Sequence, residues 1–231
     1  MAESRIASVK GDVVIEEPSV AERTVARRTA EARATIPHVE MSIEVDMSGA
    51  MELLARERGS VTALLVRACA RALRAVPRAN AAYRDGRFEL YSRVNVGLVV
   101  ASDEAYVIPT VFDADQKPLA ELSAEIDELV RLARARRLSA PAFSGATFTL
   151  WDAGTHGLTS ATIVINPPQA AALAAGEVRQ AAVVRDGAPV AGRRMTVTLT
   201  CDHRILYGAE AARFLRAVRA ELSNAPARTQ P

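Results

Sequence analysis

The chain has 231 residues, of which 49% are hydrophobic and 24% are charged, as is ordinary for a globular protein with an apolar core. Its formal net charge of +2 is too small to favour nucleic acid or another polyanion as a partner. Cys69 and Cys201 lie inside apolar patterns without ligand spacing, so neither a metal site nor a disulfide framework is predicted. No segment resembles a signal peptide or approaches the roughly 20 apolar residues of a membrane span, so we expect a cytoplasmic protein without a membrane partner.

The first predicted elements are an arm, a helix and a strand. Residues 1–17 are mixed in character, and we expect them to form an extended N-terminal arm. Ser19 and Glu22 have the spacing of a capping box, which predicts a helix from about Val20 to Ala34. Apolar and polar residues then alternate over 38–47, as in a strand with one buried face.

A second long helix is predicted after Ser60, which is a good N-cap residue. Its apolar residues follow the helical period, and Pro77 lies just beyond its end. Its other face carries a basic stripe of four arginines, Arg67, Arg71, Arg74 and Arg78. We interpret this stripe as a solvated face in preference to a contact for a nucleotide phosphate.

The remaining sequence predicts many short strands and two more helices. The strand candidates are 87–91, 94–102, 105–113, 146–151, 160–166, 171–176, 179–187 and 193–201. One helix is predicted after Pro118 and the last after Gly208. Strands and helices alternate irregularly, which indicates a single α+β domain over residues 18–224 with a large mixed sheet, followed by a flexible tail at 225–231.

The sequence CDHRILYG, residues 201–208, places His203 where an alternating strand ends and a turn begins. A neutral imidazole there could take a proton from a thiol or hydroxyl near neutral pH. The alternative is a structural histidine in an ion-pair cluster with Asp202 and Arg204. His38 is interpreted as shaping a strand start in preference to reacting, and His38 and His156, the latter in a glycine-punctuated loop, are weaker candidates for lining a site.

Four segments resemble the catalytic core of the dihydrolipoyl acyltransferases of the 2-oxo acid dehydrogenase complexes. CDHRILYGAEAARFL resembles the D-H-R-x-x-D-G signature and its following helix. The segments at 19–47, 93–129 and 146–176 resemble the family's first helix and strand, its middle and its third block. The resemblance covers roughly residues 18–224, in order and at family spacing.

The resemblance implies a chloramphenicol acetyltransferase-like fold, with a mixed sheet flanked by helices, assembled as a homotrimer. The active site is then a channel between neighbouring subunits, which coenzyme A enters from one side and the acyl acceptor from the other. The signature histidine, here His203, is implied as the general base for an attack that gives a tetrahedral oxyanion. Acetyl-CoA or another acyl-CoA is expected as co-substrate, with no permanently bound cofactor.

Two positions depart from the family pattern. Tyr207 replaces the aspartate or asparagine of the signature, a position that the resemblance implies to be structural, with Arg28 as its arginine partner and Asp202 as further support of the base. Trp151 replaces the serine that serves the oxyanion. Thr149, two residues earlier on the same strand face, and the indole N–H of Trp151 are the candidate oxyanion or pocket groups.

The sequence also has no lipoyl domain, proline-rich linker or subunit-binding domain before this core. We therefore expect a stand-alone O-acetyltransferase that acts on the hydroxyl of a small molecule in specialised metabolism, resembling the acetyltransferases of polyketide tetronate biosynthesis. The alternatives are a non-catalytic trimeric relative and, with less weight, a core acyltransferase subunit of a 2-oxo acid dehydrogenase complex.

Overall fold

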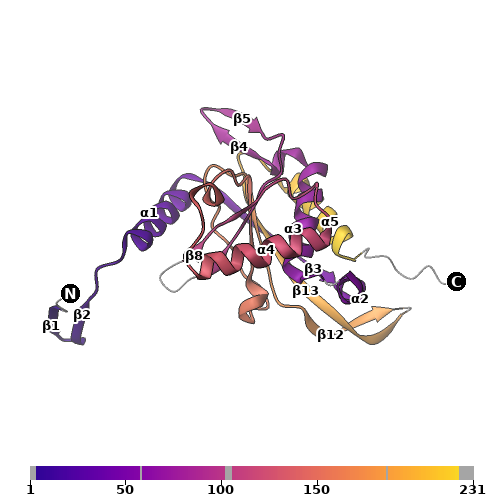
Figure 1. Ribbon diagram of the computed structural model, residues 1–231, viewed down its shortest axis with the longest axis horizontal. Helices are drawn as coiled ribbons and strands as arrows, with labels where there is room; N and C mark the ends of the chain where they lie inside the picture. Colours follow the sequence, from indigo (N-terminus) through magenta and orange to yellow (C-terminus); the bar gives the residue numbers. More distant parts are fainter. Residues whose placement is uncertain (1–3, 58, 102–105, 186, 224–231) are drawn as a thin grey trace.

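The structure is a computed structural model that describes residues 4–57, 59–101, 106–185 and 187–223 (Figure 1). The expected flexible tail at 225–231 lies outside these residues. The helices of the described chain are α1 (Val20–Thr35), α2 (Ser48–Glu57), α3 (Val61–Ala75), α4 (Leu119–Arg134) and α5 (Gly208–Ser223). Short 3-10 turns follow at η1 (Pro77–Ala79), η2 (Ala140–Phe143) and η3 (Ala153–His156). Among the described residues, no helix is long and apolar enough to cross a membrane.

The central sheet is mixed, as predicted, and has seven strands within the described ranges. These strands are β3 (His38–Asp46), β6 (Val96–Leu98), β9 (Thr110–Val111), β10 (Phe148–Asp152), β11 (Ala171–Ala175), β12 (Arg179–Arg185) and β13 (Ala188–Asp202). Strand β10 runs parallel to β6 and β11, whereas the other pairs are antiparallel. Three two-stranded ribbons join β1 (Ser4–Ser8) to β2 (Gly11–Ile15), β4 (Ala81–Arg84) to β5 (Arg87–Leu90), and β7 (Val100–Ala101) to β8 (Tyr106–Val107).

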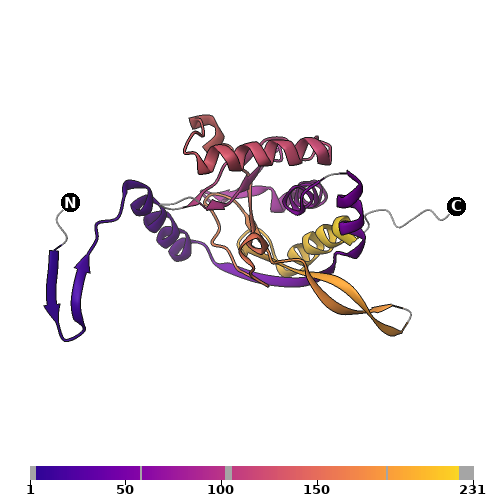
Figure 2. The same cartoon turned by 60° about the horizontal axis from the view of Figure 1, so that its bottom comes forward.

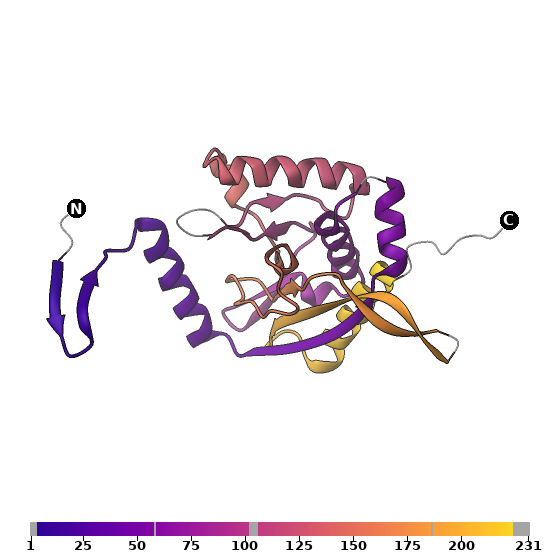
Figure 3. The ribbon, with the colours of Figure 1, turned by 90° about the horizontal axis from the view of Figure 1, so that it is seen from below.

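Strand β13 organises the sheet because three other strands pair with it. The first part of β13 pairs with β12, the later part pairs with β11 on the same side, and β3 pairs along the other side. Beyond the body, β12 and β13 continue as a twisted ribbon (Figure 3). The long antiparallel pairing holds the end of β13, and so the start of the 203–207 turn, in a fixed place.

Helices α2 to α5 pack on one face of the sheet. Val197, Leu199 and Cys201 of β13 are buried in the core together with residues of these helices, while Thr198 and Thr200 alternate onto the other face. Figure 2 shows α3, α4 and α5 gathered together, while α1 projects away with β1 and β2. The predicted alternation in β13 is therefore confirmed, and it leaves one sheet face for α1 and the loops.

Most predicted elements are present, and the capping box of α1 forms with both hydrogen bonds. Several regions differ, among them strand β4, which was not predicted. The expected extended arm at 1–17 contains the β1–β2 hairpin, and helix α2 was not predicted. Residues 160–166 are not a strand, because the Ile165 N–H donates to Nε2 of His38 and the segment packs against α1 instead of entering the sheet.

Candidate functional site

His203 lies in the turn between β13 and α5. Its backbone N–H donates to the Pro37 carbonyl at 3.0 Å, which ties the turn to the start of β3. Its imidazole is exposed, and it meets the Tyr207 ring edge-on with 5.7 Å between the ring centroids. An exposed imidazole on a fixed backbone can exchange a proton with a bound thiol or hydroxyl.

Asp202 and Arg204 form an ion pair that shapes this turn. The Asp202 carboxylate is buried and accepts from Nε and Nη2 of Arg204 at 2.9 and 2.7 Å, and from the Arg204 backbone N–H at 2.9 Å. These hydrogen bonds raise the pKa of Arg204, and the guanidinium also lies over the Tyr83 ring, 4.7 Å from its centroid. Asp202 therefore acts on His203 through the backbone of the turn.

His38 is held by hydrogen bonds at both of its ring nitrogens. It is the first residue of β3 and pairs with Asp202 in the sheet register. Its Nδ1 lies 2.8 Å from the Ile36 carbonyl oxygen, and its Nε2 accepts the Ile165 N–H at 3.2 Å. These bonds fit a neutral ring protonated on Nδ1, with both nitrogens in use.

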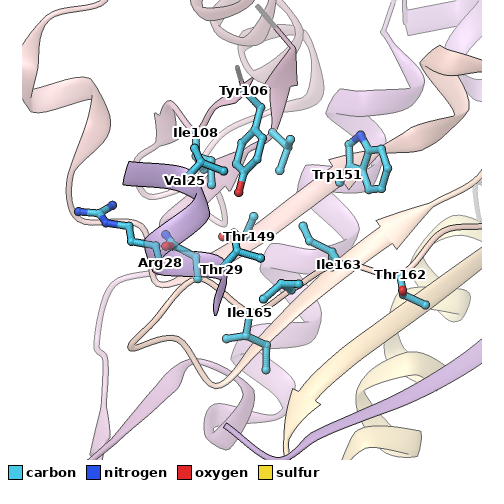
Figure 4. Close-up of a pocket in the computed structure, with 13 residues that line it drawn as sticks. Val25, Arg28, Thr29, Tyr106, Ile108, Thr149, Trp151, Thr162, Ile163 and Ile165 are labelled. Carbon is cyan, nitrogen blue, oxygen red and sulfur yellow. The ribbon is translucent and has the colours of Figure 1, made fainter. Parts of the chain in front are cut away.

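A pocket of about 400 Å³ opens beside α1, on the sheet face opposite the other helices (Figure 4). Thr149 and Trp151 reach it from β10, and Arg28 from α1, so three of the predicted site residues share one pocket. In Figure 4 the Arg28 guanidinium points away from the cavity and the Tyr106 hydroxyl points into it. The full lining is Val25, Arg28, Thr29, Val99, Tyr106, Ile108, Thr149, Trp151, Thr162, Ile163, Val164, Ile165 and Asn166.

The hydroxyl of Thr149 is already engaged. It donates to Oε1 of Gln169 at 2.6 Å, and Nε2 of Gln169 donates in turn to the Ala146 carbonyl at 3.1 Å. Both side chains are buried. A hydroxyl has one proton, so in this arrangement Thr149 can accept a further hydrogen bond but cannot donate one. Sequence reasoning missed Gln169, whose role becomes visible only when β10 and the 166–170 segment are brought together.

His203 and the pocket do not meet within one chain. Thr149 is opposite Ala172, and Ala172 is opposite Thr200, three residues before His203. Two inter-strand steps of about 4.8 Å and three residues of about 3.3 Å place the Cα atoms of Thr149 and His203 roughly 14 Å apart. His203 is not among the residues that line the pocket, so within one chain the candidate base and the pocket are separate features.

Arg28 and Tyr207 belong to these separate groups. Arg28 lines the pocket, whereas the Tyr207 hydroxyl donates to the Arg204 carbonyl at 3.4 Å, a long hydrogen bond within the turn. The structure of one chain therefore does not bring together the arginine and the signature tyrosine, and their pairing stays a prediction.

A second pocket, of about 530 Å³, lies on the other side of β10 and contains His156. Asp152, which follows Trp151 and so faces the opposite way, also lines it. Burial raises the pKa of the Asp152 carboxyl, partly offset by the Thr62 hydroxyl, which donates to it at 2.6 Å. Sequence reasoning missed Asp152, although a polar residue at an apolar position of a strand is a signal. His156 lies apart from His203 in this arrangement.

Comparison with known proteins places the chain among acyltransferases. The family model described as 2-oxoacid dehydrogenases acyltransferase (catalytic domain) matches residues 12–228. The dihydrolipoyllysine-residue acetyltransferase component of the pyruvate dehydrogenase complex of Rickettsia bellii is 32% identical, over 85% of this chain and 50% of the relative. The succinyltransferase component of the 2-oxoglutarate dehydrogenase complex of Bartonella vinsonii is 35% identical, over 87% and 52%. The chain thus spans about half the length of these relatives.

Solved structures agree with the expected fold. The dihydrolipoamide acetyltransferase of Azotobacter vinelandii superposes with a TM-score of 0.88 at 26% identity, covering 93% of each chain. A chloramphenicol acetyltransferase superposes with a TM-score of 0.57 at 18% identity, covering 85% of this chain and 94% of the other, a likeness of fold alone. The predicted chloramphenicol acetyltransferase-like α+β fold is confirmed.

The predicted role in specialised metabolism is wrong. The relatives are components of 2-oxo acid dehydrogenase complexes, so neither an O-acetyltransferase of tetronate biosynthesis nor a small-molecule hydroxyl acceptor is supported. That prediction depended on the expectation that no lipoyl domain precedes the core. The matched region is only about half of each relative, so a sequence confined to that region does not separate the two functions.

Proposed function

This chain belongs to the acyltransferase catalytic-domain family of the 2-oxoacid dehydrogenases, and from that membership we propose that it is the core acyltransferase of a 2-oxo acid dehydrogenase complex. Its reaction is the transfer of an acyl group between coenzyme A and the thiol of a dihydrolipoyl group. The observation that carries the proposal is the family match over residues 12–228, which includes an intact Asp202-His203-Arg204 at the end of β13.

His203 is the general base in this proposal. Its unprotonated ring nitrogen takes the proton of the attacking thiol, and the sulfur bonds to the carbonyl carbon of the acyl thioester while the carbonyl electron pair moves onto oxygen. When that pair returns, the bond to the leaving sulfur breaks, and the leaving thiolate takes the proton from the imidazolium. The exposed imidazole, on a turn held by Asp202 and Arg204, supports this role.

The complete site lies between two chains of a homotrimer. Two observations support this: His203 does not line the pocket of its own chain, and the Cα atoms of Thr149 and His203 lie roughly 14 Å apart. A heterologous contact of this kind, repeated around an axis, closes a ring of identical sites. The same contact is where Arg28 and Tyr207 of different chains meet.

Acetyl is the acyl group that the pocket favours. Uncharged side chains make up most of its wall, and the Arg28 guanidinium points away from the cavity (Figure 4). A succinyl carboxylate in such a pocket would lose hydration without gaining a charged partner, which is unfavourable by several kcal/mol. The pocket chemistry is the support for this choice, because both acetyl- and succinyltransferase relatives match at similar identity.

The test is acyl transfer by the purified chain. It is incubated with acetyl-CoA and dihydrolipoamide, and S-acetyl-dihydrolipoamide is measured by mass spectrometry, with succinyl-CoA in parallel and reactions lacking protein as background. We expect transfer from acetyl-CoA and much slower transfer from succinyl-CoA. A folded and assembled chain that transfers neither group would contradict the proposal and favour the non-catalytic alternative.

A further inference from the structure

Several side chains that line the pocket beside α1 carry a hydrogen-bond donor, and they differ in where that donor points and whether it is already in use. An acyl transfer places negative charge on the carbonyl oxygen, and a donor aimed at that oxygen is among the largest catalytic contributions. The two candidates from the sequence were Thr149 and Trp151. Thr149 is excluded as a donor while its proton is held by Gln169 at 2.6 Å.

Tyr106 offers a donor at a better place. Tyr106 and Ile108 are two residues apart in an extended segment, and both line the pocket. The phenol of Tyr106 extends over the cavity with its oxygen directed toward Thr149 (Figure 4). The indole of Trp151 lies farther along the pocket, separated from the Tyr106 hydroxyl in the same view. Nothing in the sequence pattern distinguished Tyr106 from any other strand residue.

We infer that the Tyr106 hydroxyl is the hydrogen-bond donor to the oxyanion, and this inference rests on the proposed function. When the thiol sulfur bonds to the thioester carbon, the carbonyl pair moves onto oxygen, and the Tyr106 O–H donates to that oxygen without giving up its proton. The bond strengthens as charge develops and weakens when the carbonyl re-forms and the leaving thiolate departs. Tyr106 thus stabilises the transition state more than the bound thioester.

Tyr106→Phe tests the inference because it removes one oxygen and keeps the ring. We expect kcat for dihydrolipoamide acetylation to fall about 100-fold, with KM for acetyl-CoA and dihydrolipoamide within a few fold of wild type. Tyr91→Phe is the matched control, since it removes a phenolic hydroxyl from a residue outside the pocket, and we expect wild-type kcat. Trp151→Phe removes the indole N–H, which is the alternative donor. We expect a smaller loss of kcat than with Tyr106→Phe.

Unchanged kcat in folded, trimeric Tyr106→Phe would overturn the inference, as would a rise in KM at constant kcat, which marks ground-state binding. A loss in Trp151→Phe that exceeds the loss in Tyr106→Phe would assign the oxyanion to the indole and would also overturn it. Failure of the proposed function looks different, because the wild-type chain would then transfer no acyl group to dihydrolipoamide.

Discussion

Two inactive variants of this chain should restore activity to each other when they assemble together. His203→Ala removes the proposed base and leaves the pocket intact, whereas Val25→Trp fills the pocket and leaves the base intact. His203 does not line the pocket of its own chain, and in the proposed trimer each site takes its base from one chain and its pocket from another. Mixed trimers should therefore contain sites in which neither substitution is present.

The expected magnitudes follow from the structure. His203→Ala alone should lower turnover about 10²–10⁴-fold, the contribution of a positioned acid–base group. It should disturb the fold little, because the side chain is exposed and the backbone bond to Pro37 remains. Val25 is half-buried on α1 and lines the pocket, so a larger side chain there intrudes on the cavity more than on the core. A mixed trimer contains either two His203→Ala chains and one Val25→Trp chain or the reverse. In both cases one of its three sites has an intact base and an intact pocket, which is about a third of the wild-type number.

The assay uses co-expression with two different affinity tags, so that sequential purification keeps only mixed trimers. Acetylation of dihydrolipoamide per trimer should reach about a third of the wild-type rate, at least an order of magnitude above either parent. Parent trimers purified in the same way provide the background. Mixed trimers no more active than the parents would refute a site shared between chains with His203 as its base.

Three further outcomes are expected. Acetyl-CoA should raise the melting temperature, since a ligand that binds only the folded state adds about 2.7 kcal/mol of stability at a hundred times its Kd; calorimetry without binding at millimolar concentration would contradict this. Tyr207→Phe should change kcat less than His203→Ala, because the hydroxyl makes only a 3.4 Å bond to Arg204 and the ring stays beside His203; equal losses would assign chemistry to the phenol. Burial raises the pKa of Asp152, so its charged form destabilises the fold above that folded-state pKa and the penalty fades as pH falls below it. Asp152→Asn should then raise the melting temperature at neutral pH and lose this gain in acid, whereas a pH-independent gain would show that charge is not its cause.

Much of the fold was predictable because its signals are local. The Ser19–Glu22 capping box needs only its own four residues, and alternation in β13 follows from one buried sheet face. The 160–166 segment has an equally good strand pattern, but its apolar side chains pack on α1 and its Ile165 N–H goes to His38, 127 residues away in the chain. A pattern of apolar residues predicts that they are buried, but it does not predict against which element they pack.

The hydrogen-bond donor to the oxyanion is likewise hard to predict from sequence alone. From sequence, Thr149 and Trp151 are natural candidates because they stand at and beside the position of the family's serine, and each carries a proton on nitrogen or oxygen. Whether that proton is available depends on a partner, and for Thr149 the partner is Gln169, 20 residues later and reached only through the folded sheet. Tyr106 has no motif to mark it, yet its hydroxyl faces the cavity (Figure 4). A side chain can therefore be assigned as a donor to substrate only after its existing hydrogen bonds are known. On that basis Tyr106 is a better candidate than Thr149, whose proton is already donated to Gln169.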